Sequence, residues 1–330
     1  MTASRIKPLA TGQQHCYDVH GDPLPCAGSG QDAEFVTGQS RPDPRFILSS
    51  PDNDQKFPGV LDQLTGLEWT RNAAPFTFPL NLDEAREVCA GLNPPGTAPE
   101  RAWRLPNRHE LFSLLHFDTA NPALAPDHPF ENVASLAFWT STPWARDPDY
   151  FWYVQLSGGR MFFHRRDSFA MVWPVRGNSG VLPVTGAAEA PLTGVQWPEP
   201  RFAVAENGPV QDLGTGLLWT PRANLGSPCL WSEALQRIET LNHDRHLGVD
   251  RWRLPSIREL ESLTHAGHHD PALPPDHPFE QWQEAYWSST TSAFETDWAM
   301  CLYLHKGAVG VGYKPGPEPF AVWPCADPAD

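Results

Sequence analysis

The sequence predicts an α+β fold built as two tandem copies of one module, each with two short helices packed on a small twisted antiparallel sheet with long loops. The first reason is a repeated motif, W-R-L-P-x-x-x-E-L, at residues 103–111 and 252–260. The second is that the same landmarks surround both copies in the same order. The third is the content of 36 prolines and 25 glycines, which predicts short elements joined by many turns.

Length and charge narrow the class of protein. The 330 residues can form two domains that each bury a core, and 40% hydrophobic residues fit a globular protein. A formal net charge of −15 disfavours nucleic acid and anionic membranes as partners, because their phosphates repel an acidic molecule. No apolar run is long enough for a transmembrane helix, so membrane insertion is not expected. No signal peptide is visible at the start of the sequence.

Residues 1–43 form a lead-in that contains two of the six cysteines. Cys16 and Cys26 flank a turn-rich segment, so we expect a hairpin closed by a disulfide; two free thiols are the alternative. Small disulfide-closed hairpins belong to oxidising compartments. The protein is therefore expected to be secreted, at an extracellular, cell-surface or periplasmic location. Without C-x-x-C, H-E-x-x-H or clustered Cys/His spacing, a metal site is not predicted.

Module one spans residues 44–176, a linker spans 177–199, and module two spans 200–330. In both modules the pattern D-x-x-T-G-L-x-W predicts a turn followed by a strand, with Gly66 and Gly216 at the flexible position.

The first helix of each module is expected at residues 83–92 and 232–241. Asp83 and Ser232 are the expected N-caps, and apolar residues follow at helical spacing. Cys89 falls on the apolar, buried face of the first of these helices.

The repeated motif begins the second helix of each module. Asn107 with Glu110, and Ser256 with Glu259, fit a capping box, in which the cap bonds the N3 amide and the acid reaches back. Capping is favoured over a catalytic role for the two acids. Arg104 and Arg253 are expected to pair with a local carboxylate or loop carbonyls, with anion binding as the alternative.

An Asp-His pair follows the second helix in both modules, at residues 127–128 and 276–277. Each pair has the composition of a base with an orienting acid, but no nucleophile is tied to it and the segment is rich in proline. Structural packing of the loop is therefore the favoured interpretation.

Each module then turns to strands, expected at residues 138–142 and 151–156, and at 286–290 and 300–304. A final V-W-P segment closes each module. Cys301 and Cys325 replace Tyr153 and Val175 of module one, and this correlated change predicts a second disulfide between them. Cys89 and Cys229 have no cysteine counterpart, so free thiols and a bridge between modules both stay open.

Together, T-G-L-x-W, W-R-L-P-x-x-x-E-L, W-[TS]-S-T and the terminal V-W-P resemble the Lcl C-terminal domain family (domain of unknown function 1566) over residues 44–176 and 200–326. The resemblance implies a C-type-lectin-like fold for each module. It also implies adhesion, since the namesake of the family is a surface adhesin that binds sulfated polysaccharide. Formylglycine-generating enzymes share the fold.

The resemblance raises calcium as a ligand, because many C-type lectins use it. The sugar-binding pattern E-P-N with W-N-D does not occur, and residues 318–320 only begin like it. No cofactor is therefore predicted.

The favoured binding residues are those that differ between modules near the strand tips. Arg160, Phe162 and His164 share one face of an expected strand, where aromatic and basic groups could stack on sugar rings and bond acidic groups. The alternative is that these aromatics form the core and the inter-module interface. The predicted set is Trp144, Tyr150, Arg160, Phe162, His164, Arg165 and Arg166 in module one, and Trp298, His305 and Tyr313 in module two.

These observations predict a ligand-binding protein of the bacterial surface or periplasm that is not an enzyme. The expected partner is a glycan or a surface protein, and homo- or hetero-oligomerisation is left open. One alternative is a structural subunit of a larger surface assembly. The more distant alternative is an oxidase of the formylglycine-generating type, which would need a reactive cysteine pair in its own motif.

Overall fold

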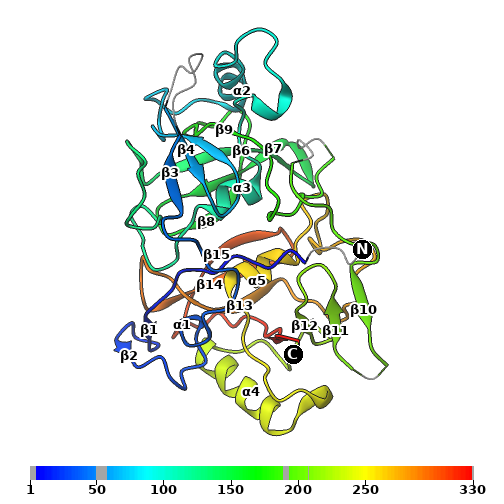
Figure 1. Ribbon diagram of the computed structural model, residues 1–330. Helices are drawn as coiled ribbons and strands as arrows, with labels where there is room; N and C mark the ends of the chain where they lie inside the picture. The colour runs from blue at the N-terminus through cyan, green and yellow to red at the C-terminus, as the bar shows by residue number, and fades with distance from the viewer. Residues whose placement is uncertain (1–4, 50–57, 189–192, 207, 329–330) are drawn as a thin grey trace. The chain divides into compact units, whose positions relative to one another are not determined.

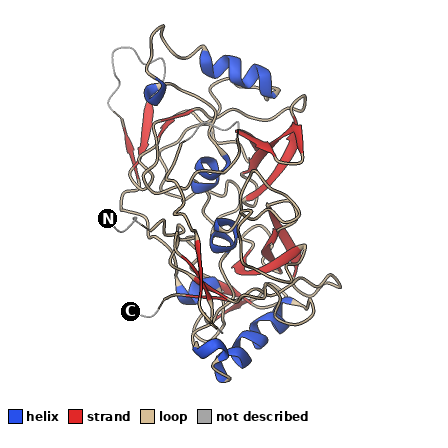
Figure 2. Ribbon diagram, turned by 90° about the vertical axis from the view of Figure 1, so that its right-hand side faces the viewer, coloured by secondary structure: helices blue, strands red, loops and turns tan. Residues whose placement is uncertain are grey.

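The computed structural model describes residues 5–49, 58–188, 193–206 and 208–328 (Figure 1). It divides into two compact bodies. Ser40–Gln196 is continuous and contains module one, whereas Met1–Gln39 and Trp197–Asp330 together form the body that contains module two. The lead-in therefore packs with the module farther along the chain. Each body has few helices, several small antiparallel sheets and extensive loops (Figure 2).

The module-one body holds two antiparallel ladders and two short α-helices. The first ladder has the order β3-β4-β5-β9, and the second pairs β6 with β7 and β7 with β8. The elements are β3 (Phe46–Leu48), β4 (Gly59–Asp62), β5 (Glu68–Thr70), α2 (Leu82–Ala90), η1 (Pro99–Arg101), α3 (Arg108–Ser113), β6 (Ala137–Trp144), β7 (Asp147–Gln155), β8 (Arg160–Arg165) and β9 (Val175–Arg176).

The module-two body repeats this plan. Its ladders are β10-β11-β12-β16 and the pairs β13 with β14 and β14 with β15, and the lead-in adds β1, β2 and α1. The elements are β1 (Cys16–Tyr17), β2 (Pro23–Leu24), α1 (Asp32–Phe35), β10 (Phe202–Val204), β11 (Val210–Asp212), β12 (Leu218–Trp219), α4 (Trp231–His243), η2 (His246–Gly248), α5 (Ile257–Ser262), β13 (Ala285–Thr291), β14 (Trp298–Tyr303), β15 (Ala308–Tyr313) and β16 (Cys325–Ala326).

Tryptophan pairs in the two cores show how closely the bodies repeat. Trp69 and Trp173 meet edge to face at 5.6 Å and 65°, and Trp219 and Trp323 do so at 5.4 Å and 61°. All four rings are fully buried. The closing V-W-P segment thus supplies a core ring to the T-G-L-x-W strand, and this contact joins the two ends of each module.

The first helix of each module begins earlier than the sequence suggested. The N-cap of α2 is Asn81, not Asp83, because the Asn81 side chain accepts the Glu84 amide and Glu84 reaches back in a second capping box. Helix α4 starts after Leu230 rather than at Ser232 and runs on to His243. Its first residue, Trp231, is buried, so core packing rather than a polar cap fixes where the helix starts.

The cysteines bear out one predicted disulfide and overturn the other. Cys16 and Cys26 are bonded and close the β1–β2 hairpin, as expected. The predicted Cys301–Cys325 bridge is wrong, since both thiols are free. Cys301 lies on β14, whereas Cys325 lies on β16 in the other ladder, so the aligned positions are not neighbours. Cys89 and Cys229 are also free and buried.

We predict that four cysteines react with iodoacetamide in denaturant without reductant, and six after reduction. The four free thiols are buried, and burial raises the pKa of Cys89 to about 12 and that of Cys229 to about 11, so the native protein at pH 8 should react little. Intact mass spectrometry counts the adducts. Six adducts in denaturant without reductant would show that Cys16 and Cys26 are not bonded.

In the part of the chain that the structure describes, no helix combines the length and apolar character needed to cross a bilayer.

Candidate functional site

The repeated motif starts with a tryptophan that is held from both sides by one asparagine. The Trp103 amide donates to Asn93 Oδ1 at 2.7 Å, and Asn93 Nδ2 donates to the Trp103 carbonyl at 2.9 Å. Asn242 holds Trp252 in the same way at 2.6 and 2.7 Å. This clamp was not predicted, although a Leu-Asn pair occurs ten residues before the tryptophan in both modules, just after α2 in one and in the last turn of α4 in the other.

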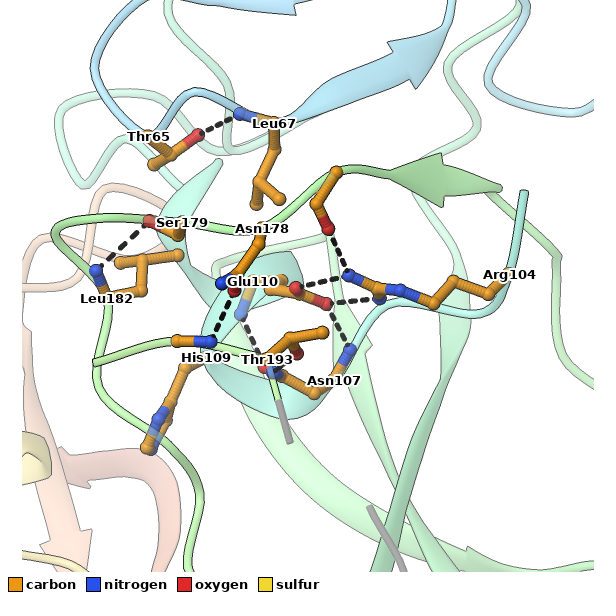
Figure 3. A network of polar contacts seen from close by, with 12 residues as sticks. Thr65, Leu67, Arg104, Asn107, His109, Glu110, Asn178, Ser179, Leu182 and Thr193 are labelled. Atoms are coloured by element: carbon orange, nitrogen blue, oxygen red, sulfur yellow. Dashed lines mark hydrogen bonds and ion pairs between the residues drawn. The ribbon is translucent and has the colours of Figure 1, made fainter. Parts of the chain in front are cut away.

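The arginine and glutamate of the motif form a bidentate ion pair (Figure 3). Arg104 Nη1 and Nη2 each donate to a Glu110 oxygen at 2.7 Å, and Glu110 Oε2 also accepts the Asn107 amide at 2.7 Å. A further bond at 3.0 Å joins Arg104 Nη2 to the Gly177 carbonyl. Both the predicted capping box and the predicted arginine–carboxylate pair are confirmed.

Module two has the same arrangement, and its arginine is more deeply buried. Arg253 donates to both oxygens of Glu259 at 2.6 and 2.7 Å, and the Ser256 amide bonds to Glu259 Oε2 at 2.8 Å. Burial opposes ionisation of Glu259, but the Arg253 guanidinium and these hydrogen bonds lower its pKa overall. The carboxylate is thus held ionised by its structural partners, and the geometry offers it no proton to exchange with a substrate.

Cys325 lies beside this ion pair, with its Sγ 3.1 Å from Arg253 Nη1. A neighbouring arginine lowers a thiol pKa when solvent can reach the site. Here full burial outweighs the arginine and raises the Cys325 pKa well above its ordinary value. The thiol therefore stays protonated and has no nucleophilic character.

A second buried ion pair ties the start of each module to the end of its second helix. Arg45 Nη2 bonds to Asp62 at 2.7 Å and to the Ser113 carbonyl at 3.0 Å. In module two, Arg201 makes the matching bonds to Asp212 at 2.8 Å and to Ser262 at 2.7 Å. This pair could have been predicted from the sequence, because the arginine of a P-R-F motif precedes the aspartate of the D-x-x-T-G-L turn in both modules.

The two Asp-His pairs take the structural place expected of them. His128 packs against Phe130 and His277 stacks on Phe279, and burial lowers the pKa of both imidazoles. A neutral histidine that packs against an aromatic ring can hold its loop in place without taking part in proton transfer.

The predicted binding residues of module one divide between the two faces of the β7–β8 ladder. Tyr150 pairs with Arg165, and Phe151 pairs with His164. As predicted, Arg160, Phe162 and His164 share a face; on it, His164 stacks on Tyr153 at 4.0 Å. Trp144, Tyr150 and Arg165 belong to the opposite face, so the structure does not gather the predicted residues into one ridge.

Trp144, Tyr150 and Phe163 form what we call the tip cluster. Trp144 stacks on Phe163 at 4.0 Å and 12°, and Tyr150 meets both rings edge-on at 5.9 Å. All three rings are half-buried, and the Trp144 indole nitrogen is buried without a hydrogen-bond partner in the described structure. A half-exposed ring cluster at the end of a sheet can accept a flat ligand against its exposed ring surfaces.

The basic residues next to the tip cluster are both ion-paired. Arg165 pairs with Asp167 at 3.2 Å, and Arg166 pairs with Asp83 at 2.6 Å. Both pairs are exposed, so they are worth little and open readily for another anion.

Module two has a smaller aromatic pair at the matching place. Trp298 lies 5.2 Å from Tyr313 in a tilted contact, and Tyr313 is 42% exposed. His305 is exposed, lies edge-on to Tyr303, and has its Nδ1 3.2 Å from the Glu284 carbonyl.

The modules differ most in what covers the tip of this ladder. Register places Lys314 where module one has Arg166. Arg166 is partly exposed, whereas Lys314 is fully buried beneath the lead-in hairpin. The Lys314 Nζ donates to the Asp18 carbonyl at 3.2 Å and to the Thr296 carbonyl at 2.9 Å. Burial lowers the Lys314 pKa to about 7. Module one leaves its own aromatic tip half-exposed.

The profile of the Lcl C-terminal domain matches residues 59–176 and 208–326, which is more than half of the sequence. The chain belongs to the Lcl C-terminal domain family. No curated protein matches it, and no solved structure matches it. The asparagine clamp and the two arginine–carboxylate pairs repeat in both modules, which indicates that these residues serve the architecture of the domain.

The second Lcl domain also has a pocket of about 420 Å³ beside the loop that follows β12. Asn224 lines it, and the Asn224 Oδ1 is buried without a hydrogen-bond partner. The other lining residues are Thr220, Pro221, Arg222, Leu225, Gly226, His246, Leu247 and Glu280. Among the described residues of the whole chain, no group of three or more His, Cys, Asp or Glu side chains could hold a metal ion.

We predict that Glu259→Gln lowers the free energy of unfolding of the module-two body by up to about 3–5 kcal/mol, because it removes the buried partner of Arg253 and leaves only the exposed Asp327 carboxylate at 3.2 Å. Glu110→Gln should cost less, since the Arg104 side chain is 18% exposed. Chemical denaturation followed by tryptophan fluorescence measures both.

Asp167→Asn is the matched control, because it breaks only the exposed pair with Arg165 and should change stability by less than about 1 kcal/mol. If all three variants unfold alike, the buried pairs do not carry the stability assigned to them.

Proposed function

We propose that this Lcl protein is a non-catalytic ligand-binding protein that acts outside the cytoplasm and binds glycans through the tip cluster of module one. We further propose that each module is related to the C-type lectin fold. The observation that carries the proposal is the tip cluster itself, a half-exposed set of three rings in module one, where module two has only the pair Trp298 and Tyr313.

The chemistry of the cluster favours a sugar. The apolar face of a pyranose ring buries well against flat aromatic rings. Arg165 lies opposite Tyr150 in the ladder and can pair with a sulfate or carboxylate on the sugar. A net charge of −15 restricts such an anion to short-range contacts, which argues against an extended polyanion.

The absence of catalysis is part of the proposal. The acids of the repeated motif are committed to arginine pairs and helix caps, and the thiols that an oxidase would need are buried. The Cys16–Cys26 disulfide is compatible with the proposed extracellular or periplasmic location.

We expect Trp144→Ala to weaken glycan binding about tenfold or more, because it removes the largest ring of the tip cluster. Arg165→Ala should weaken binding to sulfated or uronic-acid glycans and spare neutral ones. A glycan array identifies the ligand class, and calorimetry on the best ligand measures the loss.

Phe169→Ala is the control, since this ring is 63% exposed in the same module and belongs to no ring contact described for the cluster. Equal losses in Phe169→Ala and Trp144→Ala would place binding elsewhere. No glycan signal, together with a stable heteromeric complex, would instead favour the structural-subunit alternative.

A further inference from the structure

The linker after module one forms a short two-strand ribbon on that module. The Val184 amide donates to the Val195 carbonyl at 3.0 Å, and the Val195 amide donates to the Leu182 carbonyl at 2.8 Å, with parallel pairing of Pro183 and Val195. Gly194 adopts φ +114°, where a Cβ would lie 2.7 Å from the Leu182 carbonyl oxygen. We call residues 177–196 the linker ribbon.

Residues 5–39, which we call the N-terminal ribbon, contain the same two hydrogen bonds and the same parallel bridge. The Ala10 amide donates to the Gln39 carbonyl at 2.9 Å, and the Gln39 amide donates to the Pro8 carbonyl at 2.7 Å. Leu9 and Gln39 form the parallel bridge. Gly38 has φ +95°, and its Cβ would lie 2.8 Å from the Pro8 carbonyl oxygen.

The correspondence extends to sequence. Both first strands continue into Thr-Gly, with Gly12 at φ +83° and Gly186 at φ +82°, and both second strands begin with Thr-Gly. The ribbons differ in the number of residues between the two paired segments, which are 13–36 in one and 187–192 in the other. The longer of these stretches carries the disulfide hairpin and α1.

Each ribbon meets its module at the start of the second helix. Thr193 of the linker ribbon accepts a hydrogen bond from Asn107 Nδ2 at 2.9 Å (Figure 3). Thr37 of the N-terminal ribbon hydrogen-bonds to Glu259, the acid of the matching helix in module two.

The N-terminal ribbon packs on module two, although it precedes module one in the sequence. Gln13 Nε2 donates to the Thr291 carbonyl at 2.7 Å, and the Thr291 amide donates back to Gln13 Oε1 at 3.0 Å. The Thr290 hydroxyl bonds to the buried Asp32 carboxylate at 2.6 Å. The linker ribbon, by contrast, packs on the module that immediately precedes it.

The two ribbons also begin at equivalent places in their modules, next to the glycine of the T-G-L turn. In module one the chain leaves β9 at Gly177, which lies against the Gly66 turn. In module two the place against the matching Gly216 turn is taken by Arg5. The Ile6 amide bonds to the Gly214 carbonyl of that turn at 2.7 Å.

We infer that the protein is a circularly permuted pair of module–ribbon units, in which the ribbon that belongs after module two stands at the N-terminus. The binding face of module two is formed by the start of α5 and the ends of β13 and β15, and its partner is the N-terminal ribbon of the same chain. Module two therefore completes its fold with a segment separated from it by all of module one.

The first test is a permutant that begins at Ser40, joins Asp330 to Met1 through a short Gly/Ser linker, and ends at Gln39. Each module is then followed directly by its own ribbon. We expect the permutant to melt within a few degrees of the parent and to form the Cys16–Cys26 disulfide. A permutant that aggregates, or that leaves these cysteines reduced, would overturn the inference.

A permutant could also fold because the protein tolerates new chain ends at this position. The second test therefore asks whether the N-terminal ribbon binds module two without a covalent link to module one. A protease site is inserted between Gln39 and Ser40, and the folded protein is cut there. We expect residues 1–39 to stay bound on gel filtration and to keep amide protection at Ala10 and Gln39 by hydrogen-exchange mass spectrometry.

A Gln13→Ala/Asp32→Ala double variant of the uncut chain tests whether module two depends on the ribbon, because both substitutions remove hydrogen bonds between the two. It should lose amide protection in β13 and β15 and keep it in β6 and β8. Release of the cut ribbon with β13 and β15 still protected, or loss of protection in module one instead, would show that the ribbon is not part of module two.

Discussion

The buried pair between the arginine and the glutamate of the repeated motif is the constraint on which each module depends. One carboxylate caps the second helix, neutralises a buried guanidinium and accepts a backbone amide. The same guanidinium reaches the carbonyl of Gly177, directly after the closing strand. Three parts of the module are therefore fixed by one interaction, and neither charge can be removed without stranding the other in a low-dielectric interior.

Because this network repeats in both modules, it says little about function. Residues that both copies need are most simply explained by the fold. The copies differ instead at the ends of the β7–β8 and β14–β15 ladders, where module one has the half-exposed tip cluster and module two has a lysine buried beneath a hairpin. The proposed binding chemistry therefore belongs to the three-ring cluster of module one, which module two does not repeat.

The buried lysine shows how strongly the N-terminal ribbon is integrated into module two. Lys314 donates to backbone carbonyls from both the ribbon and the module and lies 4.3 Å from the Trp231 ring centre. Burial of an ammonium group is costly unless its hydrogen bonds are satisfied. The ribbon supplies part of that satisfaction, so the segment belongs to the body of module two rather than to a flexible leader.

The repeat, the capping boxes of the two second helices, the arginine–carboxylate pairs and the hairpin disulfide could be predicted from the sequence. These features depend on short-range patterns, such as an asparagine three residues before a glutamate, and a duplicated chain displays each pattern twice. Contacts between distant segments were decided only by the tertiary structure. Alignment placed Cys301 and Cys325 as partners, but they lie in different ladders, and no local pattern reveals that residues 5–39 pack on the module farther along the chain.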